Sequence, residues 1–171
     1  MPTNSYRVRV TKDHLVFSAG HFITIDTPDG RICERIHGHN WQTCVDVCGP
    51  LDNNGYVYDF ISLREALQAI VADLDHRMLL PLNHPQIKVA AGDREVEVLY
   101  DTKRWVFPRE DCRLLPIAQT TAELLAHWIG AQLRMKLGDA AQTLTWLRVH
   151  VEENFGQWAT CELRQDSSSD G

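Results

Sequence analysis

The N-terminal part of the chain alternates hydrophobic and polar positions, a pattern that is typical of β-strands. Residues 6–26 are rich in Val, Ile, Phe and Thr, which predicts a long first strand. The sequence Ser18-Ala19-Gly20 interrupts the alternation and predicts a bulge. Residues 26–30 are dense in turn-forming residues, so we expect the chain to reverse there. A second strand is predicted from about Gly38 to Gly49.

Two later segments carry helical periodicity. The first is predicted to begin with the capping pair Ser62 and Glu65 and to end near residues 75–76. The second is predicted to begin with Thr120 and Glu123. Gly138 is the expected stop of this second helix. The apolar stripes are Leu63, Leu67, Ile70, Val71 and Leu74 in the first helix, and Leu124, Leu125, Trp128, Ile129 and Leu133 in the second.

The remaining strands lie between and after the helices. Residues 95–100 and 104–107 predict an extra hairpin that turns at 101–103. Residues 144–153 and 157–163 predict two closing strands, followed by a polar tail at 164–171 that we expect to be frayed. This order predicts an α+β fold with a four-stranded antiparallel sheet and both helices on one face. Open sheet edges are usually covered, so self-association through the sheet is expected.

Composition narrows the class of protein. The chain has 171 residues, of which 44% are hydrophobic, and a net charge of -6. These values predict one folded domain over residues 1–171 and exclude a disordered chain. An acidic chain without a basic run is a poor nucleic-acid binder. We find no apolar run long enough to span a membrane and no signal peptide, so we expect a cytoplasmic protein with free cysteines.

Three histidines suggest a metal site. His37 and His39 flank a glycine and share one side of the second strand, about 7 Å apart by strand rise. If the first two strands pair around residues 26–33, His21 meets them on the same face. Three imidazoles with an open fourth position suit catalytic zinc, which would polarise a carbonyl or hydroxyl oxygen. The alternative set of Cys33, His37 and His39 would favour a structural site, and spacing does not choose between them.

Two further groups are candidates for moving protons. Cys33 lies four residues before His37, and a nearby divalent cation would favour its thiolate as a base or nucleophile. The alternative for Cys33 is a half-buried residue without a chemical role. Asp75 precedes His76 and could orient its imidazole if the helix ends there. The alternative for this pair is an ordinary polar helix terminus.

Glu153 is a candidate ligand-binding carboxylate at the end of a strand. It shares a strand face with Val149 and Val151, whereas Glu152 points to the opposite face. A carboxylate there can accept paired hydrogen bonds from the N–C–NH₂ edge of a pterin or guanine. Otherwise it is a solvated strand end.

Together these segments resemble the 6-pyruvoyltetrahydropterin synthase and 6-carboxytetrahydropterin synthase superfamily. The matching motifs follow the family's order over nearly the whole chain. They are Phe17-Ser18-Ala19-Gly20-His21, Cys33-Glu34-Arg35-Ile36-His37-Gly38-His39-Asn40, Asp59-Phe60, Leu74-Asp75-His76, Thr120-Thr121-Ala122-Glu123 and the strand end at Glu153. The resemblance implies the tunnelling fold, in which the four-stranded sheets of several subunits close into a barrel. It also implies a homo-hexamer, a dimer of trimers, with active sites at subunit interfaces.

The resemblance further implies a substrate and residue roles. The substrate would be 7,8-dihydroneopterin triphosphate, whose side-chain hydroxyls would chelate the zinc before triphosphate is eliminated. The implied residues are His21, His37 and His39 as zinc ligands, Cys33, Asp75 and His76 as catalytic residues, and Glu153, Thr120 and Thr121 as pterin-binding residues.

The superfamily has two branches. The pyruvoyl branch makes a tetrahydrobiopterin precursor, whereas the carboxy branch also releases acetaldehyde and feeds 7-deazaguanine and queuosine synthesis. The short spacing from Cys33 to His37-Gly38-His39 resembles the bacterial carboxy enzymes, so we favour that branch.

Two departures from the family pattern stand out. The insert at about residues 84–117 is longer than in compact bacterial members, and Glu152-Glu153-Asn154 replaces the usual Glu-Thr pair. Two other classes therefore stay open. One is an inactive pterin- or purine-binding module that retains zinc, and the other is a structural zinc protein.

Overall fold

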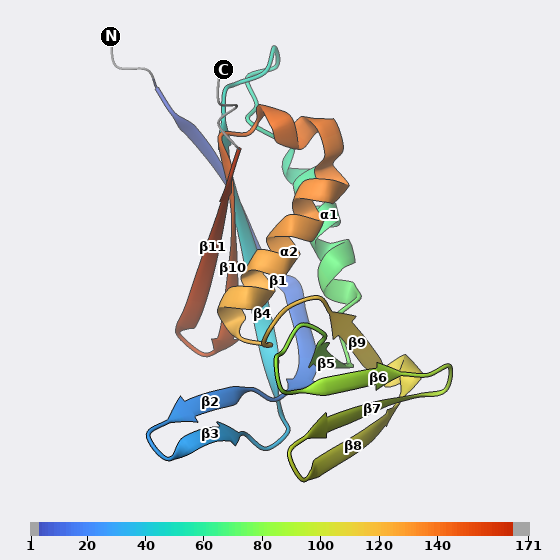
Figure 1. Cartoon of the computed structure of the whole chain (residues 1–171). Helices are drawn as coiled ribbons and strands as arrows, with labels where there is room; N and C mark the ends of the chain where they lie inside the picture. Colours follow the sequence, from blue (N-terminus) through green and yellow to red (C-terminus); the bar gives the residue numbers. More distant parts are fainter. Residues whose placement is uncertain (1–3, 166–171) are drawn as a thin grey trace, which may run out of the picture.

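Eleven strands and two α-helices follow one another along residues 4–165, the part of the chain that the computed structural model describes (Figure 1). The strands are β1 (Tyr6–His21), β2 (Thr24–Thr27), β3 (Gly30–Cys33), β4 (His37–Gly49), β5 (Arg77–Pro81), β6 (Lys88–Ala91), β7 (Glu95–Tyr100), β8 (Lys103–Pro108), β9 (Cys112–Leu115), β10 (Trp146–Asn154) and β11 (Gln157–Arg164). The helices are α1 (Phe60–Ala72) and α2 (Ala122–Leu137), with short 3-10 helices η1 (Arg109–Asp111) and η2 (Gly138–Thr143).

The main sheet has six strands in the order β11-β10-β4-β1-β5-β9. Its four long strands are antiparallel neighbours, as the alternating pattern predicts. The prediction of four strands is wrong for the sheet as a whole, because β5 pairs in parallel with the end of β1 and β9 pairs in parallel with β5. Both added strands are short and lack a clear alternation, so periodicity does not reveal them.

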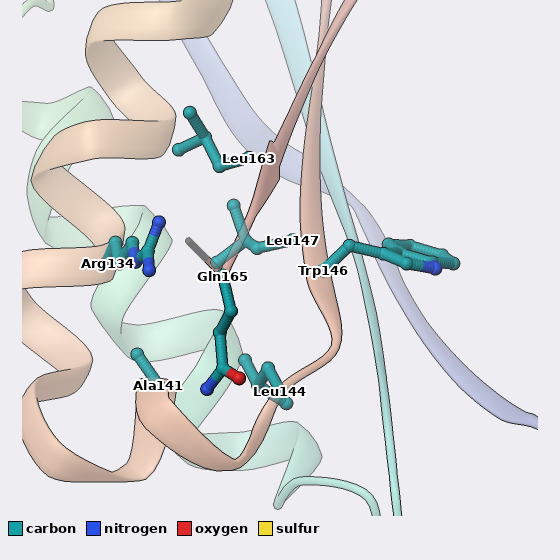
Figure 2. A pocket seen from close by; sticks show the side chains of 7 residues that line it. All are labelled: Arg134, Ala141, Leu144, Trp146, Leu147, Leu163 and Gln165. Atoms are coloured by element: carbon teal, nitrogen blue, oxygen red, sulfur yellow. The ribbon is translucent and has the colours of Figure 1, made fainter. Parts of the chain in front are cut away.

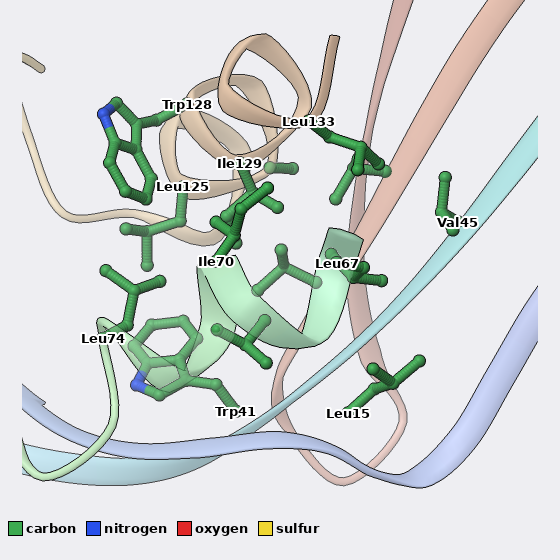
Figure 3. Packing of buried hydrophobic residues seen from close by; sticks show 14 of the residues in the cluster. Leu15, Trp41, Val45, Leu67, Ile70, Leu74, Leu125, Trp128, Ile129 and Leu133 are labelled. Atoms are coloured by element: carbon green, nitrogen blue, oxygen red, sulfur yellow. The ribbon is translucent and has the colours of Figure 1, made fainter. Parts of the chain in front are cut away.

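Both helices cover one face of this sheet, as predicted (Figure 1). α2 packs on β10 and β11, while α1 packs on β1. In the core between the layers, Trp41 and Val45 of β4 face Leu67, Ile129 and Leu133 of the helices (Figure 3). Burial of each large apolar side chain contributes about 1.5–3 kcal/mol, so this cluster is the main stabilising core.

The helix starts differ from the predicted ones. Asp59 caps α1, and its carboxylate accepts the backbone N–H of Ser62 at 2.9 Å, so Ser62 lies inside the helix. Thr121, not Thr120, caps α2. Asp and Thr are both good N-caps, so a motif with adjacent candidates does not fix the boundary. The predicted stop at Gly138 is confirmed, since this residue is the C-cap with φ 58°.

The β1–β4 register brings distant residues of the first two long strands together. The irregularity lies between Thr11 and Val16, so the bulge predicted at residues 18–20 is wrong. Pairing is regular from Val16 to the end of β1, where His21 lies opposite His37. β1 ends at His21 rather than continuing to residue 26, and the turn predicted at 26–30 instead connects β2 to β3.

The insert forms a separate three-stranded sheet, β6-β7-β8, beside the β2–β3 hairpin (Figure 1). The predicted hairpin is confirmed as β7–β8, and Asp101 in its turn has φ 50°. β6 was not predicted. A second apolar cluster lies here and contains Phe22, Met78, Leu80, Val96 and Val98.

The two closing strands are confirmed as β10 and β11. The carbonyl of Arg164 accepts a hydrogen bond from Arg134, so the tail predicted to fray from residue 164 begins as ordered strand. Residues 166–171 of that tail lie outside the described residues. Within residues 4–165, none of the helices has the length and apolar content needed to cross a membrane.

Candidate metal centre

Three histidines converge where β1 and β4 meet. His21 ends β1, and His37 and His39 begin β4 with the same face parity. One ligand atom from each ring lies within 4.8 Å of the others, and the Nε2 atoms of His21 and His37 are 3.1 Å apart. The His21 ring centroid lies 4.6 Å from that of His37 and 5.2 Å from that of His39. The predicted meeting of the three imidazoles on one sheet face is therefore present.

Backbone carbonyls set the tautomers of two of these rings. His21 Nδ1 lies 2.9 Å from the Thr120 carbonyl oxygen, and His37 Nδ1 lies 2.8 Å from the Arg35 carbonyl oxygen. A carbonyl only accepts, so each Nδ1 carries the proton and each Nε2 presents its lone pair. Metal-binding histidines are commonly held in this way by the nitrogen that faces away from the ion. Facing Nε2 lone pairs at 3.1 Å fit a shared cation.

The environment also favours uncharged ligands. His21 is 1% exposed, and burial lowers its pKa to about 4, with His37 and His39 acting in the same direction. The Thr120 carbonyl opposes this shift. His21 is therefore neutral at neutral pH and need not lose a proton to bind a metal. Three histidine nitrogen donors are a typical zinc set.

Trp41 packs against two rings of the histidine cluster. It is fully buried, and its ring lies edge-on to His21 and His39, at centroid distances of 5.0 and 5.3 Å. Phe17 stacks on the other side of Trp41 at 5.8 Å. This apolar packing fixes the ring positions and excludes water from one side of the histidines.

Glu153, and not Glu152, faces the histidines. Glu153 Oε1 lies 3.4 Å from His21 Nε2 and 3.7 Å from His39 Nε2. Glu152 turns toward its own hairpin, where its carboxylate accepts the N–H of Gly156 at 2.6 Å. The parity of β10 predicts this difference, since Glu153 follows the buried residues Val149 and Val151 on one face.

Cys33 is the last residue of β3 and lies on the hairpin that leads into the histidines. It is half-buried, and its S–H donates to the Glu34 carbonyl at 3.5 Å. Burial raises the pKa of the thiol, whereas the charge of Lys103 lowers it. Cys33 is not in the close group of ligand atoms, so the geometry favours the three-histidine set over the alternative that includes this cysteine.

Asp75 and His76 lie at the edge of β1, apart from the histidine cluster. Asp75 Oδ1 accepts the Ser18 N–H at 2.7 Å, and the His76 N–H donates to the Ser18 carbonyl at 2.6 Å. The Ser18 amide, and then His76, lower the pKa of Asp75. Asp75 Oδ2 lies 2.9 Å from His76 Nδ1, yet the His76 side chain is 83% exposed. His76 also has φ 54°, an unusual value for a residue with a side chain.

The two threonines have different places. Thr120 is fully buried, and its hydroxyl donates to the Phe22 carbonyl at 3.1 Å. It therefore supports His21 from behind rather than facing the open side. Thr121 caps α2 and is half-buried. The supporting carbonyls of Arg35 and Thr120 were not predicted, because every residue has a carbonyl and no sequence signal marks these two.

A small pocket at the opposite end of β10 and β11 has no relation to this centre. It lies between the end of α2 and the closing strands (Figure 2). Its lining residues are Arg134, Ala141, Leu144, Trp146, Leu147, Leu163 and Gln165. The cavity volume of about 10 Å³ leaves room for about one water and no organic ligand.

Several known proteins have sequences similar to this one. A protein of Methanocaldococcus jannaschii is 30% identical over 154 residues, covering 89% of this chain and 88% of the relative. A protein of Pyrococcus horikoshii is 31% identical over 124 residues, covering 71% of each. Both carry the provisional name 6-carboxy-5,6,7,8-tetrahydropterin synthase. A protein of Aquifex aeolicus with that name is 28% identical over 133 residues, covering 77% of this chain and 75% of the relative.

Solved structures show the same fold. The 6-pyruvoyl tetrahydropterin synthase of Plasmodium vivax superposes with a TM-score of 0.86 at 23% identity, covering 95% of this chain and 99% of the other. Over residues 9–164 the sequence matches the 6-pyruvoyl tetrahydropterin synthase family. This match spans most of the chain, and the chain therefore belongs to the 6-pyruvoyl tetrahydropterin synthase family.

Proposed function

We propose that the protein is a zinc-dependent enzyme of the carboxy branch. It would convert 7,8-dihydroneopterin triphosphate and water to 6-carboxy-5,6,7,8-tetrahydropterin, acetaldehyde and triphosphate. The observation that carries the proposal is the convergence of the three Nε2 donors beside the Glu153 carboxylate. The name shared by the relatives that cover most of the chain supports the choice of branch.

His21, His37 and His39 would hold the zinc, which when bound makes the O–H and adjacent C–H groups of the substrate side chain more acidic. The Thr120 and Arg35 carbonyls keep two of these imidazoles in the tautomer that binds metal. Trp41 packs edge-on to the His21 and His39 rings and keeps these two in place.

Glu153 would anchor the pterin ring. An ionised carboxylate accepts two hydrogen bonds, which matches the paired N–H donors on the N–C–NH₂ edge of a pterin. Its position beside His21 and His39 would place the ring edge next to the metal. Thr121 accepts the Leu124 N–H at the start of α2, and its own hydroxyl hydrogen can still donate to the ring. Thr120 would act through His21.

Cys33 and His76 would move the protons. Cys33 on the β3 strand would remove a proton from the substrate side chain, and Asp75 would orient His76 and stabilise its protonated form. The exposure of His76 suits a role at the surface of a neighbouring copy. We propose that the complete site lies at an interface between copies of the chain in a homo-hexamer. The short spacing of Cys33 from His37 further supports the carboxy branch, and the product would enter 7-deazaguanine and queuosine synthesis in the cytoplasm.

Product analysis tests the proposal. The zinc-loaded protein is incubated with 7,8-dihydroneopterin triphosphate, and the products are identified by mass spectrometry. We expect 6-carboxytetrahydropterin with equimolar acetaldehyde. The pyruvoyl product without acetaldehyde would assign the protein to the other branch. Unchanged substrate in the presence of bound zinc would contradict both and leave a pterin- or purine-binding module. Cys33→Ala is the matched variant, since it should lower kcat by about 10²–10⁴-fold but leave binding by such a module unchanged.

A further inference from the structure

The insert makes a set of contacts with the hairpin that carries Cys33. The Tyr100 hydroxyl donates to the Arg31 carbonyl at 3.3 Å. Arg31 donates in turn to the Gln86 side chain at 3.3 Å. The Trp105 ring stacks on Phe22, with centroids 4.9 Å apart. Phe22 directly follows His21, so the insert supports both the cysteine strand and the segment next to the metal centre.

Lys103 makes the contact between the insert and Cys33 itself. Its Nζ donates to the carbonyl oxygen of Cys33 at 2.8 Å. The same ammonium lies 5.9 Å from the centroid of the Trp105 ring, a distance at which cation–π attraction contributes. Lys103 is thus held between its own strand and the end of β3, seventy residues earlier in the chain.

We propose that Lys103 is a positioning residue for Cys33: its ammonium, hydrogen-bonded to the Cys33 carbonyl, fixes the end of β3 and holds a positive charge next to this residue. This inference rests on the proposed role of Cys33 as a base. Among the described residues, Lys103 and Glu34 are the charged groups acting on the thiol, and they act in opposite directions. Burial raises the pKa of the Cys33 thiol and is the largest influence on it, and the cation from the insert opposes this effect in part.

The test is the pH dependence of Cys33 alkylation by iodoacetamide in the zinc-loaded, full-length protein. Peptide mapping by mass spectrometry separates Cys33 from Cys44, Cys48 and Cys112, which are buried, and from Cys161. Lys103→Met and Lys103→Gln should raise the midpoint pH of the Cys33 alkylation rate by about 0.5–1 pH unit. They should also slow alkylation at pH 7 about 3- to 10-fold. Lys103→Arg should restore most of the rate because it keeps the charge.

Arg104→Met is the matched control. It removes a cation from the same strand, but its guanidinium pairs with Glu97 inside the insert and should leave the Cys33 midpoint unchanged. The inference is overturned if Lys103→Met and Lys103→Gln keep the wild-type midpoint, or if Lys103→Arg shifts it equally. Circular dichroism confirms that each variant is folded.

The alkylation result is independent of pterin turnover, so the two proposals fail separately. A protein that does not convert the substrate but shows the midpoint shift contradicts the proposed function alone. A protein that converts the substrate with an unshifted midpoint contradicts the role of Lys103 alone. In an active enzyme, Lys103→Met should also lower kcat about 3- to 10-fold at pH 7 and recover at higher pH, with little change in KM.

Discussion

The three histidines and the Asp75–His76 pair are both predicted from sequence, yet the structure places them in different environments. The three histidine rings meet, two of them pack edge-on to the buried Trp41, and backbone carbonyls fix two of the tautomers. His76 is 83% exposed and is attached to the outer edge of β1 through Ser18. The histidine cluster thus forms within one chain, whereas the His76 side chain faces outward. Under the proposed function, folding alone would assemble the metal ligands, whereas proton transfer by His76 would need a neighbouring copy.

The largest expected effect comes from removing one ligand. His37→Ala removes a converging Nε2 donor and should weaken zinc binding by more than about 100-fold and abolish turnover. Zinc affinity is measured by competition with a chromogenic chelator. His127→Ala, which removes an exposed histidine from α2, is the control and should retain both properties. Stoichiometric, tightly bound zinc in His37→Ala would contradict the assignment of the ligands.

Complementation between two inactive variants tests whether Cys33 and His76 of one site come from different copies of the chain. Cys33→Ala and His76→Ala should each lower kcat by about 10²–10⁴-fold, the usual contribution of a general acid or base. If the two residues of one site come from different copies, unfolding and refolding an equal mixture should restore about a quarter of wild-type activity. Turnover of the reassembled mixture is measured with each refolded single variant as control. No restoration would place both residues in the same chain.

Asp75→Asn tests how much the Asp75 carboxylate contributes to the stability of the fold. The lowered pKa of Asp75 means that its carboxylate stabilises the fold fully above about pH 4, the unfolded value, and loses this contribution as the pH falls through the lower folded value. The difference in unfolding free energy between wild type and Asp75→Asn should therefore shrink with acidification. Urea unfolding at several pH values measures it. A difference that grows below pH 4 would contradict the sign.

The sequence predicted the histidine cluster because it depends on local rules. Face parity places His37 and His39 together, and the turn before β3 limits where His21 can pair. The start of α2 was predicted one residue too early because adjacent residues can both cap, as Thr120 and Thr121 show. β5 and β9 were missed because they are short strands in a parallel arrangement that only tertiary structure specifies.

Contacts between distant segments could not be predicted from the sequence, and the reason is physical. Lys103 donates to a backbone carbonyl, and the alternation of β8 gives no information about which strand will lie beside it. The same holds for the carbonyls behind His21 and His37. Sequence patterns identify groups that are chemically distinctive, whereas supporting backbone groups are the same at every position.

The smallest effect is expected at Thr120, where a substitution can separate the role of the side-chain hydroxyl from that of the backbone carbonyl. Thr120→Val removes the hydroxyl that donates to the Phe22 carbonyl but keeps the backbone oxygen that accepts from His21. We expect a loss of about 1 kcal/mol in unfolding free energy, because a buried hydrogen bond is lost. Zinc affinity should change by less than about 3-fold, since the tautomer of His21 is still fixed. Urea unfolding and chelator competition measure the two quantities. A loss of zinc affinity as large as that of His37→Ala would show that the hydroxyl, and not the carbonyl, orients His21.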